Sequence, residues 1–299
     1  MQTSKGFAPY TGGHYNEKLT KNGLTGFDLK YLALIFMVLD HIHYFFEFTG
    51  MIPIWFSWLG RLAAPLFLFC LIEGFIHTHD KKRYFLKIYS ISIIMGLIRF
   101  GFYNVLDFAV RGDGFFPQNA MLSSFVVLLV VLMGIDWIRE KKYFIGILAV
   151  VIPVILPYLF IYFVYIPFAD NLTINIITSL INFTILPLHT MIQNGGTITL
   201  IEGVILYLFS FCKNKNTRIY AFVTFELLYG IGLVTLSIGS FNVHTLIFEA
   251  FEWMSAFSAI FMLCYNGQRG HGNSRFFYLF YPAHIYVLYG ISLIAYSIF

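Results

Sequence analysis

Residues 30–41 read KYLALIFMVLDH, an apolar run of helix length that carries a lysine at one end and an adjacent aspartate and histidine at the other. Residues 55–75, WFSWLGRLAAPLFLFCLIEGF, repeat the pattern, because Arg61 and Glu73 interrupt an otherwise apolar sequence. An ionisable group in the centre of a bilayer costs about 2.5 kcal/mol or more, so such groups are rarely kept without a function. The two runs therefore predict a membrane protein whose chemistry lies at these polar positions.

The overall composition predicts several membrane spans. Of the 299 residues, 59% are hydrophobic and only 11% are charged, and the mean hydropathy is +0.75. A soluble domain carries about 25% charged residues. The net charge of +4 comes from basic residues in short loops between apolar runs, which is an orientation signal rather than a binding stripe. We therefore expect membrane lipid, and no nucleic acid, as a partner.

The apolar runs predict an all-α, polytopic helix bundle. About 20 apolar residues cross a bilayer as a helix, and this rule gives about nine transmembrane helices. The segment 172–192 is also apolar but contains asparagines, a proline and a histidine, so we interpret it as a re-entrant or interfacial broken segment, with ten spans as the alternative. The predicted spans lie near 29–48, 54–76, 84–106, 120–138, 143–168, 196–212, 218–239, 243–265 and 275–298.

Basic residues gather in alternate connections between these runs. The basic connections are 81–83, 139–142, 213–218 and 269–275, and the connections between them are poor in lysine and arginine. The positive-inside rule then places the N-terminus in the cytosol and the C-terminus outside. We expect a cytosolic N-terminal tail over residues 1–28, followed by a single transmembrane domain over 29–299 in the plasma membrane.

The predicted topology sets the polar residues at two depths. His41 lies eleven residues after Lys30, or about 16 Å further along the helix axis. The next span returns, so Arg61 is expected near Asp40 and His41 in the outer half. By the same argument, Glu73 is expected near Lys30 at the inner face. Asp40 need not orient His41, because adjacent residues on a helix point about 100° apart, and it is free to pair with the arginine instead.

Further polar residues fall in later spans. Arg99 and the glutamates Glu249 and Glu252 are expected in the outer half, and the two glutamates, three residues apart, are expected to share a helix face. His284 lies in the middle of the last span. Charges buried in a bundle also neutralise one another and fix helix packing, so a purely structural role stays open. No spacing typical of a metal site is present, and we expect no metal.

Four segments carry a family resemblance. They are residues 30–41, GRLAAPLFLFCLIEGFIHTHDKKRY (60–84), YNGQRG (265–270) and FFYLFYPAHIYVLY (276–289). Together they resemble the TraX family of integral membrane proteins, which is linked to N-terminal acetylation of pilin. The first segment also resembles a broader superfamily of membrane acyltransferases, which includes the acyltransferase-three and heparan glucosaminide acetyltransferase types.

The resemblance implies an acetyltransferase that takes acetyl groups from cytosolic acetyl-CoA. The acceptor would be an amine or hydroxyl of a peptide, glycan or lipid on the outer side. His41 would act as general base or acetyl carrier, with Asp40 and Arg61 positioning it or stabilising the oxyanion. Residues expected to face the substrate are Glu73, Arg99, Asn119, Tyr281 and His284. Residues expected to hold the phosphates of coenzyme A are Lys30, Lys81, Lys82, Arg83, Arg269 and Arg275.

Two other classes of function fit the same residues. Buried charges also form ion or proton pathways in transporters, although the sequence shows no internal repeat with matching broken helices. A non-catalytic membrane scaffold is the third hypothesis. Under that hypothesis, replacing His41 or Arg61 would change stability and leave function intact.

Overall fold

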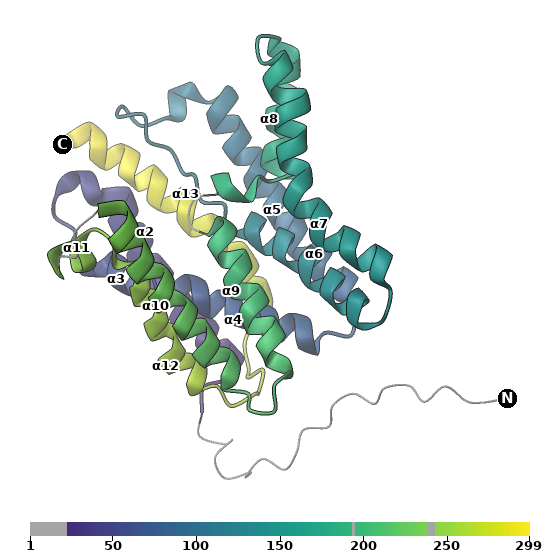
Figure 1. Cartoon of the computed structure of the whole chain (residues 1–299). Coiled ribbons are helices and arrows are strands. Elements are labelled where there is room, and N and C mark those ends of the chain that lie inside the picture. Colours follow the sequence, from purple (N-terminus) through teal and green to yellow (C-terminus); the bar gives the residue numbers. More distant parts are fainter. Residues whose placement is uncertain (1–22, 193–194, 239–242) are drawn as a thin grey trace.

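The computed structural model describes residues 23–192, 195–238 and 243–299, and its regular elements there are all helices (Figure 1). The predicted tail lies mostly outside these ranges. The principal helices are α2 (Gly26–Phe46), α3 (Trp55–Gly60), α4 (Ala63–His77), α5 (Lys81–Asn104), α6 (Met121–Arg139), α7 (Tyr143–Phe160), α8 (Leu172–Thr184), α9 (Gly196–Leu208), α10 (Thr217–Ile238), α11 (Val243–Phe248), α12 (Ser258–Leu263) and α13 (Ser274–Ile298). The predicted all-α class is confirmed.

Six helical stretches in the described residues are long and apolar enough to cross a bilayer. They are Gly26–Thr49, Trp55–His77, Lys81–Asn104, Met121–Arg139, Tyr143–Phe168 and Arg275–Ile298. Three more apolar helices are shorter: Leu172–Thr184, Gly196–Phe211 and Phe251–Leu263. The chain is therefore a multi-pass membrane protein, but the count of about nine spans is not confirmed.

Two predicted segments differ from simple spans. The run 243–265 is divided into α11, the 3-10 helix η7 (Phe251–Phe257) and α12. In the segment 172–192, α8 has 13 residues and a length of about 20 Å, which is shorter than the roughly 30 Å hydrocarbon core. After α8 the chain leaves the regular helix near Pro187. A broken segment was expected here, and the structure has one.

The start of α2 is fixed by a capping box. The Thr25 hydroxyl accepts a hydrogen bond from the Asp28 backbone N–H, and the Asp28 carboxylate accepts one from the Thr25 backbone N–H. The helix therefore begins at Gly26, three residues before the predicted boundary. Backbone hydrogen bonds also join residues 24–27 to residues 264–269, so the loop before α13 lies along the entrance to α2.

The second span is interrupted at Arg61. Pro65 has no backbone N–H to donate to the Arg61 carbonyl, and the helix accordingly divides into α3 and α4 at residues 61–62. Gly60 lets this break approach α2, because a Cβ atom there would lie 2.3 Å from the Asp40 Cβ. Both features bring Arg61 against the turn of α2 that carries Asp40.

Helix α4 lies at the centre of the main hydrophobic core. Its buried side chains pack against residues of α2, α6, α9 and α12, and Leu66, Leu68 and Ile72 are fully buried. In contrast, only 11% of the most apolar 18-residue stretch within Tyr143–Phe168 is buried inside the protein. That stretch is therefore positioned to face lipid, while His41 of α2 and Glu73 of α4 are turned into the protein.

Candidate functional site

A polar cavity of about 470 Å³ lies between α2, the α3–α4 break, α9, α10, η7 and α13. It is large enough for a small ligand. Its chemistry is unusual because two of its charged residues, Asp40 and Arg61, belong to apolar stretches long enough to cross a bilayer. Its titratable and amide-bearing wall residues are Asp40, His41, Arg61, Asn119, Glu202, Glu226, Tyr229, Glu252 and Tyr281.

Two histidines from opposite ends of the chain form a hydrogen-bonded relay in the cavity wall. His284 Nδ1 lies 2.8 Å from the Phe280 carbonyl oxygen, which can only accept, so this nitrogen carries the proton. With both rings neutral, His284 Nε2 then accepts a hydrogen bond from the Nδ1–H of His41, 2.7 Å away. The carbonyl at one end therefore sets the tautomer of both rings.

The relay leaves a lone pair on His41 Nε2. The Asn119 amide nitrogen lies 2.9 Å from this atom and donates to it. His41 is buried with 5% exposure, and its ring stacks on that of His284 with centroids 4.8 Å apart. The Asn119 Oδ1 atom is buried without a hydrogen-bond partner among the described residues. With both rings neutral, the arrangement fixes the His41 ring and directs its Nε2 lone pair to the Asn119 amide in the cavity wall.

Asn119 is supplied by the loop before α6, and an arginine holds that loop in place. The buried Arg111 donates to the Phe45 carbonyl at 2.9 Å and forms an ion pair with Asp113 at 2.8 Å. The hydrogen bonds from this guanidinium lower the pKa of the Asp113 carboxyl below its ordinary value. The loop is thus tied to the C-terminal end of α2, next to the relay.

Arg61 carries the second polar group of the cavity. Its guanidinium forms ion pairs with Asp40 and with Glu252, both at 3.0 Å. The expected proximity of Arg61 to Asp40 is confirmed, and Asp40 points to the arginine while His284 orients His41. The Arg61 Nε–H is buried and has no hydrogen-bond partner in the described part of the chain. It is therefore a donor available to a ligand.

Glu249 and Glu252 were predicted to share one helix face, but they do not lie on the same helix. Helix α11 ends at Phe248 and η7 begins at Phe251, so Glu249 lies in the connection and approaches His244 at 3.8 Å. The prediction of a common face was wrong because it assumed an uninterrupted span. Only Glu252 of the two reaches the cavity wall.

Glu202 of α9 and Glu226 of α10 form a carboxyl pair that the sequence analysis missed. They hydrogen-bond to each other, and Glu226 also accepts a hydrogen bond from Ser255. Both side chains are buried in the cavity wall. Two hydrogen-bonded carboxyls share a proton, since two adjacent carboxylates repel each other. The signal was available: each is a lone acidic residue in an apolar run, as Asp40 is.

The surroundings of Lys30 and Glu73 differ from the prediction. Glu73 forms an ion pair with Arg218 at 2.6 Å and approaches His77 at 3.6 Å. Lys30 instead lies over the Phe27 ring at 5.1 Å, and within the described residues no carboxylate approaches it to ion-pair distance. The expected pair of Lys30 with Glu73 is therefore wrong.

The predicted phosphate-binding residues lie near the beginnings of α2, α5 and α13. Lys81 is held in an ion pair with Asp136. Arg269 lies over the Phe27 ring at 5.8 Å, on the loop that runs along the start of α2. The side chains of Lys82, Arg83, Arg269 and Arg275 are exposed.

The five predicted substrate-facing residues separate into two groups. Asn119 and Tyr281 line the cavity, and His284 is bonded to His41 in its wall. Glu73 and Arg99 do not line it. The Arg99 guanidinium lies over the Phe183 ring of α8 at 5.2 Å, and no ion pair with a carboxylate is found for it in the described ranges.

The sequence matches one family model, described as TraX protein, over residues 26–292. Among curated proteins, the chain is similar to the Probable fimbrial assembly protein FimC, serogroup H1, of Dichelobacter nodosus. The two are 34% identical over 77 residues, which are 23% of this chain and 29% of that protein. The alignment thus spans less than a third of the relative. No solved structure matches the chain.

Proposed function

The chain belongs to the TraX family, and we propose that it is an integral membrane acetyltransferase with its N-terminus in the cytosol. It moves an acetyl group from cytosolic acetyl-CoA to an amine or hydroxyl at the outer side of the plasma membrane. The observation that carries this proposal is the His284–His41–Asn119 relay, which presents a basic nitrogen to a polar cavity. The matched fimbrial assembly protein favours a pilus subunit as acceptor.

His41 Nε2 has two possible tasks in such a transfer. As a general base it removes the proton of the acceptor N–H or O–H while the acceptor attacks the thioester carbon, the C–S bond breaks and coenzyme A leaves as the thiol. As a nucleophile it takes the acetyl group itself and releases coenzyme A, and the acceptor then attacks the acetyl-imidazole. In both cases, the substrate takes the position that the Asn119 amide occupies at Nε2.

Arg61 is the candidate donor to the oxyanion. Its terminal nitrogens are held by Asp40 and Glu252, which fixes the guanidinium in place, and its Nε–H is without a partner among the described residues. A donor that is oriented before the reaction stabilises developing charge at little reorganisation cost. Asp40 in this scheme is a positioning residue, since its carboxylate contacts Arg61.

Basic residues at the predicted cytosolic end of the bundle are compatible with binding of acetyl-CoA, the acetyl donor. Exposed basic residues there, Lys82, Arg83, Arg269 and Arg275, offer charge for the phosphates of coenzyme A. Lys30 adds an ammonium group without a carboxylate partner in the described residues. These charges also serve as an orientation signal, so binding has to be measured directly.

The test is transfer from labelled acetyl-CoA by the purified protein in nanodiscs. His41→Gln should abolish acetylation of the protein or acceptor and the release of coenzyme A. His43→Gln, on the same helix but outside the cavity wall, is the matched control and should retain both. Equal turnover in His41→Gln would remove His41 from the mechanism. A folded protein that neither binds nor consumes acetyl-CoA would favour one of the other two hypotheses, a transporter or a scaffold. Solute uptake into proteoliposomes without acetyl-CoA would identify the transporter.

A further inference from the structure

The polar cavity carries more negative than positive charge. Asp40 and Glu252 together hold one guanidinium, that of Arg61, which leaves one negative charge on this group. The Glu202–Glu226 pair, with its shared proton, adds a second negative charge. No further lysine or arginine lines the cavity in the described part of the chain. The cavity therefore favours a cation, at the wall that α9, α10 and η7 form.

Two buried acceptor atoms in this cavity have no hydrogen-bond partner among the described residues. They are Oδ1 of Asn119 and Oε1 of Glu226, whose side chains line the cavity and are only 4% and 2% exposed. A buried polar atom without a partner is costly, so a ligand that pairs with it gains affinity. A ligand with several N–H donors would satisfy both atoms and the lone pair of His41 Nε2.

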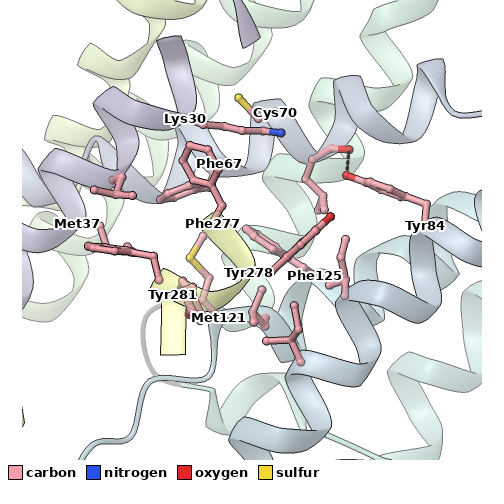
Figure 2. Close-up of a pocket in the computed structure, with 16 residues that line it drawn as sticks. Lys30, Met37, Phe67, Cys70, Tyr84, Met121, Phe125, Phe277, Tyr278 and Tyr281 are labelled. Atoms are coloured by element: carbon pink, nitrogen blue, oxygen red, sulfur yellow. Dashed lines mark hydrogen bonds between the residues drawn. The ribbon is translucent and has the colours of Figure 1, made fainter. Parts of the chain in front are cut away.

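Another wall of the cavity is apolar. Four residues, Met37, Phe67, Met121 and Tyr281, line both the polar cavity and a second pocket. Figure 2 shows these four side chains with Lys30, which is the charged residue among those lining the second pocket. Because like charges repel, a cationic ligand is favoured at the wall with the carboxyl pair and not on the side of Lys30.

The histidine relay holds only one additional proton. His41 Nε2 has a single lone pair, and the Nδ1–H of His41 leads to His284, whose own Nδ1–H ends at the Phe280 carbonyl. A carbonyl oxygen accepts a hydrogen bond but does not carry a proton away, so the relay has no exit at that end. A protonated amine loses one proton before it attacks a thioester and another as the amide forms. Such an acceptor requires a second proton-accepting group, whereas a hydroxyl does not.

Building on the proposed function, we propose that Glu202 and Glu226 bind the acceptor as an ammonium ion and take its first proton. The electrons of the broken N–H bond stay on nitrogen, and the pair then holds two protons. The neutral amine attacks the thioester carbon, the C–S bond breaks, and His41 Nε2 takes the second proton and returns it to the leaving thiolate. The extra proton on the pair passes to water when the product leaves, so each transfer releases one proton.

Two amines of the same shape separate this role from a structural one. Ethylamine is an ammonium ion at pH 7, because an alkyl ammonium has a pKa of about 10.4, whereas the fluorines of 2,2,2-trifluoroethylamine keep it largely neutral. The double variant Glu202→Gln/Glu226→Gln removes the charge of the pair and keeps its shape. With labelled acetyl-CoA and protein in nanodiscs, it should acetylate ethylamine about 10²-fold more slowly than native protein, and trifluoroethylamine within about threefold of the native rate.

The infrared spectrum gives a second readout, on native protein and without acetyl-CoA. In protein with ¹³C-labelled glutamate, ethylamine should convert a carboxylate band into a protonated carboxyl band, because the pair gains a proton. Ethyltrimethylammonium, a cation without an N–H, should not. Glu249→Gln, which removes a carboxylate outside the cavity wall, is the matched control for transfer and should leave the rates with both amines unchanged.

The two proposals fail in different ways. An equal loss of transfer to the two amines in the double variant, or no loss with ethylamine, would overturn the role of the pair and leave the acetyltransferase proposal standing. An unchanged infrared spectrum with ethylamine would do the same. The expected infrared change in a protein that does not consume acetyl-CoA would instead remove the transferase and keep the cation-binding pair.

Discussion

Replacing His284 with phenylalanine tests the relay. The variant keeps an aromatic ring next to Phe280 but removes the acceptor for His41 Nδ1–H. A buried donor left without a partner costs about 1–3 kcal/mol of unfolding free energy. His41 avoids the full cost by moving its proton to Nε2, because the Asn119 amide rotates and offers its unpartnered Oδ1 atom as acceptor. We therefore expect a loss near 1 kcal/mol, at the low end of that range.

The same shift removes the basic lone pair from the cavity. Transfer should fall about 10²-fold or more, the usual contribution of a positioned general base. His284→Gln, whose side-chain oxygen replaces the acceptor, should recover part of the activity. The ¹⁵N shifts of His41 should show Nε2 unprotonated in the native protein and in His284→Gln, and protonated in His284→Phe. An unprotonated Nε2, or transfer within twofold of native, in His284→Phe would refute the relay.

Three further predictions concern stability, each read from thermal unfolding in detergent. Gly60→Ala should destabilise the protein by about 1–3 kcal/mol, because the new methyl group overlaps Asp40. A Gly290→Ala control, where the added Cβ meets no neighbouring atom within 4 Å, should change the melting temperature little. Arg218→Ala should lower the free energy of unfolding by about 3–5 kcal/mol, because it leaves Glu73 buried without its ion-pair partner. Adding Glu73→Gln should recover part of this stability, and an equal loss of stability in the double variant would contradict the reasoning. The pKa of Asp113 is lower in the folded than in the unfolded protein, so its carboxylate stabilises the fold fully above pH about 4. This stabilisation is lost as the pH falls through the lower pKa of the folded state. The melting temperature of Asp113→Asn should therefore lie below that of the native protein above pH about 4, and the difference should shrink below that pH.

The pairing of Arg61 with Asp40 in the candidate site could be predicted from the sequence. The argument that α2 and the following span run in opposite directions places Arg61 level with Asp40, and their ion pair at 3.0 Å confirms it. The polar positions in the apolar runs pointed to His41 and His284, but not to the bond between them. The depth of a residue in the membrane follows from counting residues along the helix. The direction in which its side chain points also depends on how the helix is rotated about its axis. That rotation is set by packing against other helices, which residue spacing alone does not specify.

The rest of the site depends on that packing. Arg218 was interpreted as a loop charge that orients the chain, which concealed its role as the partner of Glu73. Glu202 and Glu226 sit in apolar runs on separate helices, and only the approach of α9 to α10 makes them a pair. Likewise, the division of 243–265 into three short helices has no strong breaker residue to signal it.

The hydrogen bond between His41 and His284 joins residues 243 positions apart, on the first and last described helices. Synthesis proceeds from the N-terminus, so α13 leaves the ribosome after the other described helices. Until α13 packs against α2, the Nδ1–H of His41 lacks its His284 acceptor. The tautomer of His41 is therefore fixed late in the assembly of the fold, after the described helices between α2 and α13 have been made.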